Sequence, residues 1–186
     1  MKRIGFALVG FVALLGAQNM APVSAPTTPP AHPTQLASVD DAFARAAIQG
    51  NDAELRAANL ALQRSHADGV LAFARLMIVD HSTIAKEGAP FMKRHLVHMP
   101  APLGAPDELA MQYLSGLSSV DFDQQYALLQ IGDHLATMTA FATEARDGKD
   151  PALKAFATKW EPTIQAHLEL AVTLVKHVGG NTPFRQ

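Results

Sequence analysis

The sequence predicts an all-α protein, namely an antiparallel four-helix bundle with a short extra helix in the connection between the second and third long helices. After residue 37, alanine, leucine and long polar side chains dominate, and apolar residues recur every three or four positions. The tripeptide Ala-Phe-Ala occurs once in each of four long stretches, at 42–44, 72–74, 140–142 and 155–157. A phenylalanine flanked by small residues lets helices approach closely. Both observations indicate helices packed around one core.

Capping and helix-breaking residues define the ends of the expected helices. Ser38 and Asp68 are suitable N-caps for the first two, and Asp150 followed by Pro151 begins the last. Pro162 lies inside the last helix and should kink it or divide it into two shorter helices, because proline removes one N–H. The expected helices cover residues 38–65, 68–98, 107–114, 119–146 and 151–178.

The first residues predict export. Lys2 and Arg3 precede an apolar stretch at 4–17 that contains no acid. This is the pattern of a secretory signal peptide, and the stretch is shorter than the about 20 apolar residues of a transmembrane helix. We expect residues 1–21 to be removed and the mature protein to be periplasmic, with no stable membrane span. A retained membrane anchor is the alternative.

Composition bounds the rest of the chain. Cleavage after Ala17 or Ala21 leaves a Pro/Ala/Thr-rich linker at 22–37, a four-helix domain at 38–180 and a tail at 181–186. The chain has no cysteine, so its stability must come from core burial rather than from disulfides. A net charge of −2 does not suit a nucleic-acid-binding surface. The partner is left open, with a protein of the cell envelope as the class considered.

Four polar residues fall one per long helix, on the stripe that should face the core: Glu54, His81, His134 and His167. Each is separated from the phenylalanine of its own helix by close to a whole number of turns. Imidazole and carboxylate are ligands of zinc, copper and iron, and helix bundles build metal sites from inward side chains. The pattern therefore predicts one buried transition-metal site, with the identity of the metal left open.

The depth of these residues in the bundle can be compared from their distances to the turns. Glu54 and His81 are nearly equidistant from the turn between their helices and should lie level. His134 and His167 differ by about one turn, or roughly 5 Å, relative to theirs. A kink at the proline of the last helix would either absorb or worsen this mismatch.

Two aspartates directly precede two of the candidate ligands. Asp80 precedes His81 and Asp133 precedes His134, and adjacent residues on a helix point about 100° apart. Asp80 lies at the edge of the apolar stripe and is expected to accept a hydrogen bond that orients an imidazole of another helix. Alternatively, Asp80 lies on a solvated flank of its helix. Asp133 is expected to lie on such a flank.

Methionines and the other histidines carry weaker signals. Met77 and Met138 lie four residues from His81 and His134, which would favour copper, although methionine at helical spacing also fills cores. The histidines at 32, 66, 95, 98 and 177 fall in the linker, at a turn or near helix ends. Tyr126 and Trp160 are expected to be core aromatics. No nucleophile elbow, phosphate loop or dinucleotide fingerprint occurs in the sequence.

A resemblance rests on several motifs between residues 39 and 178: Asp52-Ala53-Glu54-Leu55, Phe73-Ala74-Arg75-Leu76-Met77 before Asp80-His81, Phe122-Asp123 with Tyr126 and His134, the stretch 150–157, and Pro162 with His167. On these motifs the chain resembles a bacterial family of exported ferritin-like proteins catalogued as a domain of unknown function and often labelled outer-membrane proteins. The resemblance implies a ferritin-like bundle in the cell envelope and supplies no settled activity.

The chain departs from di-iron ferritins at their metal motif. Those proteins use Glu-x-x-His on two helices, whereas Ile78 and Ile164 stand three residues before His81 and His167. A histidine-rich site for a single ion, with Glu54, is therefore expected in place of a carboxylate-bridged pair.

Two functions remain open from the sequence. The first is an exported metal-binding bundle for storage, buffering, sensing or a redox reaction. The second is an interaction or structural module of the envelope, in which Glu54 and the histidines form a buried hydrogen-bonded network without metal. A hydrolytic or redox enzyme is a third reading, for which the sequence offers no substrate pocket.

Overall fold

A computed structural model describes residues 39–95 and 104–179, with the side chains of 92–95 left out. Within these ranges every regular element is a helix, which confirms the all-α prediction. The expected signal peptide, linker and tail, together with His32 and His98, lie outside the described residues.

Five helices make up the described chain: α1 Val39–Arg64, α2 Asp68–His95, α3 Ala105–Ser115, α4 Ser119–Asp147 and α5 Pro151–Gly179. The described ends lie within two residues of their predicted positions, except that α2 is described to His95, three residues before its expected end. α5 runs without interruption through Pro162, so the prediction of two shorter helices is wrong. Pro162 is exposed, as is Thr158 one turn earlier, so water can solvate the carbonyl that proline leaves without a donor.

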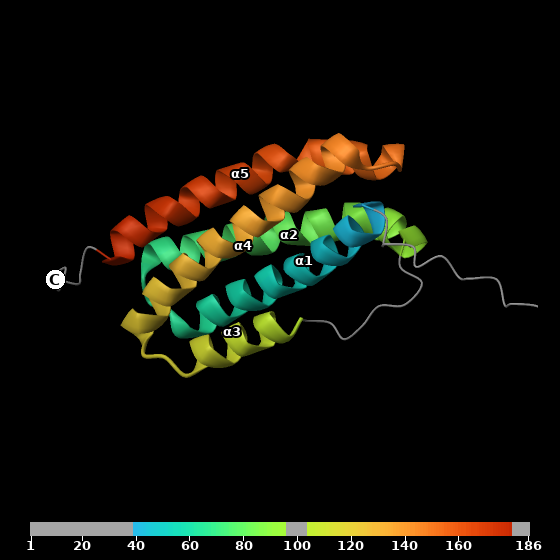
Figure 1. Cartoon of the computed structure of the whole chain (residues 1–186). Helices are drawn as coiled ribbons and strands as arrows, with labels where there is room; N and C mark the ends of the chain where they lie inside the picture. Colours follow the sequence, from blue (N-terminus) through green and yellow to red (C-terminus); the bar gives the residue numbers. More distant parts are fainter. Residues whose placement is uncertain (1–38, 96–103, 180–186) are drawn as a thin grey trace, which may run out of the picture. The chain divides into compact units, whose positions relative to one another are not determined.

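The long helices pack as two antiparallel pairs (Figure 1). α1 lies against α2 and α4 lies against α5, each pair joined by a three-residue link at 65–67 or 148–150. The pairs meet through contacts of α1 with α4 and of α2 with α5. The short helix α3 contacts α1 and α4. No described helix is long and apolar enough to span a bilayer.

Two apolar clusters fill the space between the long helices. The first cluster includes Phe73 and Met77, and the second includes Phe43, Phe141 and Phe156. Each of the four long helices contributes to both clusters, so each helix passes from one to the other along its length. The five aromatic residues predicted to be buried are all at most 9% exposed, which confirms the phase of the helices: Phe43, Phe73, Phe141, Phe156 and Trp160.

Buried and capping carboxylates hold the helix ends. Asp150 accepts hydrogen bonds from the backbone N–H groups of Ala152 and Leu153, as an N-cap should. Asp40 lies in the first turn of α1, where its charge complements the helix dipole. Its Oδ1 also accepts from the backbone N–H groups of Lys149 and Asp150, so it ties the start of α1 to the link between α4 and α5.

Candidate functional site

A layer of polar side chains separates the two apolar clusters. On α2, His81 lies between Met77 of the first cluster and Ile84 of the second, at helical spacings of four and three. On α5, His167 lies between Ile164 and Ala171 in the same way. The members of this polar layer, all at most 3% exposed, are Glu54, His81, Gln130, His134 and His167.

The three imidazoles of the polar layer meet at its centre. One ring nitrogen from each of His81, His134 and His167 lies within 4.8 Å of the other two. The ring centroids are 5.3 Å apart for His134 and His167, 5.4 Å for His81 and His167, and 5.8 Å for His81 and His134. The one-turn mismatch between His134 and His167 therefore does not keep their rings apart.

Each imidazole donates a hydrogen bond from one of its ring nitrogens. His81 Nδ1 lies 3.1 Å from Asn51 Oδ1 and His134 Nδ1 lies 2.8 Å from the carbonyl oxygen of Gln130. His167 Nε2 lies 2.8 Å from Asp80 Oδ2. All three acceptors are oxygens without hydrogen, so the bonded ring nitrogen must carry the proton. In a neutral imidazole the other nitrogen then presents a lone pair.

Those other nitrogens have no hydrogen-bond partner among the described residues: His81 Nε2, His134 Nε2 and His167 Nδ1. We call them the open nitrogens. A buried polar atom without a partner is uncommon and costs roughly 1–3 kcal/mol. Three of them lie in neighbouring rings, and Glu54 Oε1 and Gln130 Oε1 of the same layer also have no hydrogen-bond partner among the described residues.

Burial keeps the three imidazoles neutral. It lowers the pKa of His81 to about 3, with smaller contributions from the charges of His134 and His167. It lowers the pKa of His134 to about 4, although the bond to the Gln130 carbonyl opposes the shift. Burial also lowers the pKa of His167, against the opposing effect of Asp80. At neutral pH the open nitrogens are therefore lone-pair donors and are not protonated.

Glu54 lies beside His134 and outside the close set of the three histidines. Its Oε2 accepts from Gln130 Nε2 at 2.7 Å, and its Oε1 lies 3.5 Å from His134 Nδ1, the nitrogen that is already bonded to the Gln130 carbonyl. Burial, followed by the charge of Asp133, raises the pKa of Glu54 to about 8. The structure thus brings the three histidines together and places a neutral carboxylic acid behind one of them.

The neighbouring residues divide between the polar layer and the core. Asp80 accepts from His167, an imidazole of another helix, in the arrangement that the sequence suggested. Asp133 is partly buried rather than on a solvated flank, and burial, with the charge of Asp107, raises its pKa to about 6. Met77 is a fully buried member of the first apolar cluster, and Met138 packs against the second.

The sequence argument missed two residues that orient the site. Asn51 accepts from His81, and Gln130 binds both His134 and Glu54. Both carried a signal, because Asn51 lies three residues before Glu54 and Gln130 lies four before His134, which places each on the same helix face. Polar residues at that spacing on an apolar stripe mark a buried polar layer rather than a single ligand.

The fold and the site define an all-helical protein with a buried three-histidine cluster. The chain belongs to the family described as Domain of unknown function (DUF4142), whose sequence model matches residues 25–174. The matched region contains every member of the polar layer. Comparison with curated proteins finds no match, and comparison with solved structures finds none either.

Proposed function

We propose that the protein binds one transition-metal ion through the open nitrogens of His81, His134 and His167. The observation that carries the proposal is the hydrogen bonding of the three imidazoles. In each ring one nitrogen is bonded to an oxygen acceptor, and the other nitrogen has no partner among the described residues. Each ring also lies close to the other two. Metal-ligating histidines characteristically use their second nitrogen in this way.

The distances suit a site that tightens on binding. Nitrogen ligands about 2.0–2.1 Å from a tetrahedral ion are about 3.3 Å from each other. Nitrogens within 4.8 Å of one another require only small side-chain adjustments to reach that separation. Three neutral imidazoles suit zinc, copper or iron, and they leave a fourth position for water or another small ligand.

The absence of hydrogen bonds at the open nitrogens favours metal binding over the alternative of a metal-free network. A network that only specifies helix packing needs a partner for each buried group. In the described part of the chain, one nitrogen of each of the three rings lacks that partner. A bound ion would satisfy all three at once.

The proposal places this site in an exported ferritin-like bundle. The basic residues Lys2 and Arg3 followed by the apolar stretch at 4–17 support a signal peptide, and the family match begins at residue 25, beyond it. Two antiparallel pairs of long helices with the polar layer midway support the ferritin-like arrangement. We propose a periplasmic location for the mature protein.

Metal-dependent stability tests the central proposal. The mature protein is stripped with a chelator, and its thermal unfolding is followed after addition of zinc, copper or iron. A metal that binds only the folded protein stabilises it by about 2.7 kcal/mol at a free concentration 100 times Kd. We expect the melting temperature to rise for wild type, and the rise to be lost in His81→Ala and His134→Ala.

His66→Ala is the matched control, because His66 is exposed at the link between α1 and α2. Each variant is compared with its own metal-free form, so that the cost of removing a buried ring is not mistaken for lost binding. If none of the three metals raises the wild-type melting temperature, or if both ligand variants keep the full rise, the three-histidine site is refuted.

Export is tested by cell fractionation. We expect the mature chain, lacking residues 1–21, in the periplasmic fraction. A full-length chain that keeps its initiator methionine and remains in the membrane pellet would show that residues 4–17 are an anchor.

A further inference from the structure

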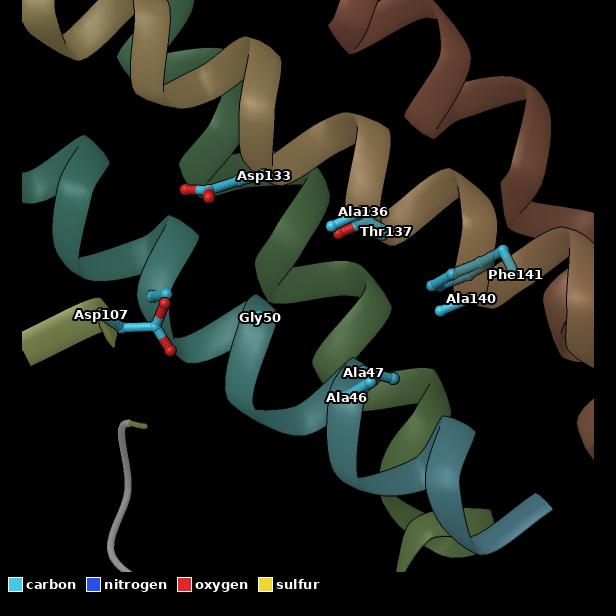
Figure 2. Close-up of a pocket in the computed structure, with 10 residues that line it drawn as sticks. Ala46, Ala47, Gly50, Asp107, Asp133, Ala136, Thr137, Ala140 and Phe141 are labelled. Atoms are coloured by element: carbon cyan, nitrogen blue, oxygen red, sulfur yellow. The ribbon is translucent and has the colours of Figure 1, made fainter. Parts of the chain in front are cut away.

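A crevice between α1 and α4 leads from the surface toward the histidine cluster. Its outer cavity, about 150 Å³ in volume, is lined by Asp107 of α3, Asp133 of α4, Gly50 of α1 and several alanines (Figure 2). A smaller inner cavity of about 10 Å³ shares Gly50, Thr137 and Phe141 with it. The inner cavity has room for about one water molecule.

The inner cavity reaches the polar layer. It is lined by Asn51 and by His81, which is 3% exposed and whose Nε2 finds no hydrogen-bond partner in the described chain. The two cavities together therefore connect a surface opening to one of the three imidazoles.

Gly50 lines both cavities, and helix geometry alone does not explain why a glycine stands there. A glycine inside a helix costs roughly 0.5–1 kcal/mol relative to alanine. No glycine in the described residues has positive φ, so the backbone of α1 does not require one at this position. A Cβ built on Gly50 would lie 3.8 Å from Thr137 Oγ1, an ordinary contact, so close helix approach does not require it either. A methyl group fits here in ordinary contact, and only a larger side chain would crowd Thr137.

The outer cavity has an acidic end. Figure 2 shows the carboxyl groups of Asp107 and Asp133 at one end of the cavity, on two different helices, with Gly50 further along. A cleft lined by charges of one sign concentrates ions of the other sign and raises their rate of association. Here the charge favours cations.

Resting on the proposed function, we propose that metal ions reach the three-histidine site through this crevice, attracted by Asp107 and Asp133 and passing between Gly50 and Thr137. Because the inner cavity holds about one water molecule, the route admits an ion with few of its own waters and excludes a chelator. The site thus takes up and releases a free cation that has shed part of its hydration shell. A bulky metal complex cannot deliver its ion directly.

The test measures uptake and release of Co²⁺ by the mature, metal-free protein in a stopped-flow spectrometer. In Gly50→Leu the added side chain should fill the space where the two cavities adjoin, and both rates should fall by about tenfold or more with Kd unchanged. Thr137→Leu closes the same passage from the other wall and guards against a local defect of α1. Gly50→Ala fits the available space and should keep wild-type rates.

Gly132→Leu is the matched control. Gly132 lies on α4, and a Cβ there meets nothing within 4 Å. Asp107→Asn combined with Asp133→Asn should slow uptake several-fold and weaken its dependence on salt. Removal of bound Co²⁺ by EDTA should proceed at a rate independent of EDTA concentration, because the chelator must wait for the ion to leave.

The outcomes separate the two proposals. If wild type binds Co²⁺ but Gly50→Leu and Thr137→Leu take it up at the wild-type rate, ions use another route and the inference is wrong. Slower uptake with an unchanged release rate would indicate a weakened site rather than a closed passage, and would also overturn it. If wild type binds neither Co²⁺ nor any of zinc, copper and iron, the proposed function itself fails.

Discussion

Asp80 on α2 accepts a hydrogen bond from His167 Nε2 on α5, with 2.8 Å between the two atoms. The carboxylate holds the proton on Nε2 and leaves the lone pair on Nδ1, which has no hydrogen-bond partner among the described residues. This contact joins two helices and fixes the tautomer of a buried ring. Carboxylate–histidine pairs of this kind raise the basicity of a metal ligand and fix its orientation.

Asp80→Asn should therefore weaken metal binding without removing a ligand. The amide oxygen can still accept from His167, but it carries no charge, and we expect Kd to rise by about 10- to 100-fold. Competition with a chromophoric chelator measures the change. Asp52→Asn is the control, since Asp52 forms an exposed pair with Arg56 on α1. Equal affinities of wild type and Asp80→Asn would show that this carboxylate does not act on the site.

The metal-free protein should lose stability in acid because of its buried imidazoles. The folded pKa values of His81 and His134, about 3 and about 4, lie below the ordinary value of 6.5, so only the unfolded chain takes up protons between these limits. The free energy of unfolding should fall below pH 6.5 by up to about 1.4 kcal/mol per pH unit for each ring. Denaturant titrations in the presence of a chelator measure this slope. The slope is read in Glu54→Gln, which lacks the opposing titration of Glu54, and a stability of that variant that stays constant from pH 6.5 to 5 would contradict the prediction.

Glu54 should produce the opposite dependence on the alkaline side. Its folded pKa of about 8 lies above the ordinary value of 4.5, so the stabilisation from its protonated form is complete below pH 4.5 and is lost as the pH rises toward 8. Between pH 6.5 and 8 the metal-free wild type should become less stable, and Glu54→Gln should remove that decline. The same denaturant titrations apply. A decline of equal slope in the variant would assign it to another group.

Phe73→Ala and Phe156→Ala should each lower the free energy of unfolding by about 3–5 kcal/mol. Phe73 lies in the first apolar cluster, in edge contact with Tyr126, and Phe156 lies in the second, against three other phenylalanine rings. Chemical denaturation measures both losses. Leu109→Ala on α3 is the control, because Leu109 is 65% exposed and its loss should change stability by less than about 0.5 kcal/mol.

Asp40→Ala should destabilise the protein by about 1–3 kcal/mol, because it leaves the backbone N–H groups of Lys149 and Asp150 without their acceptor. Asp40→Asn keeps an acceptor oxygen and should cost less. Thermal unfolding of both variants makes the comparison. If alanine and asparagine have the same small effect, the tie between α1 and the link from α4 to α5 contributes little.

The helices and their core-facing stripes could be predicted because their causes are local. Ser118 and Asp150 cap helices through neighbouring N–H groups, and a 3.6-residue period identifies which side of a helix is apolar. The same period identified the three histidines that meet and the aspartate that lies beside one of them. For Asp133, the period predicted only a position beside the apolar stripe, facing solvent. The nearby helix α3 makes that position partly buried.

Relations between helices were decided by the tertiary structure. The sequence alone determined the fold class, the helix ends and the polar residues that turn inward, since each depends on residues a few positions apart. The orientation of each imidazole depends on an acceptor: Asn51 and Asp80 lie on other helices, and Gln130 lies one turn earlier on the same helix. Three features depend on how far one helix is shifted along its neighbour. They are the position of Glu54 beside His134, the equal depth of His134 and His167 in the bundle, and the crevice at Gly50. Side-chain packing in the two apolar clusters determines that offset, and no local pattern in the chain encodes it.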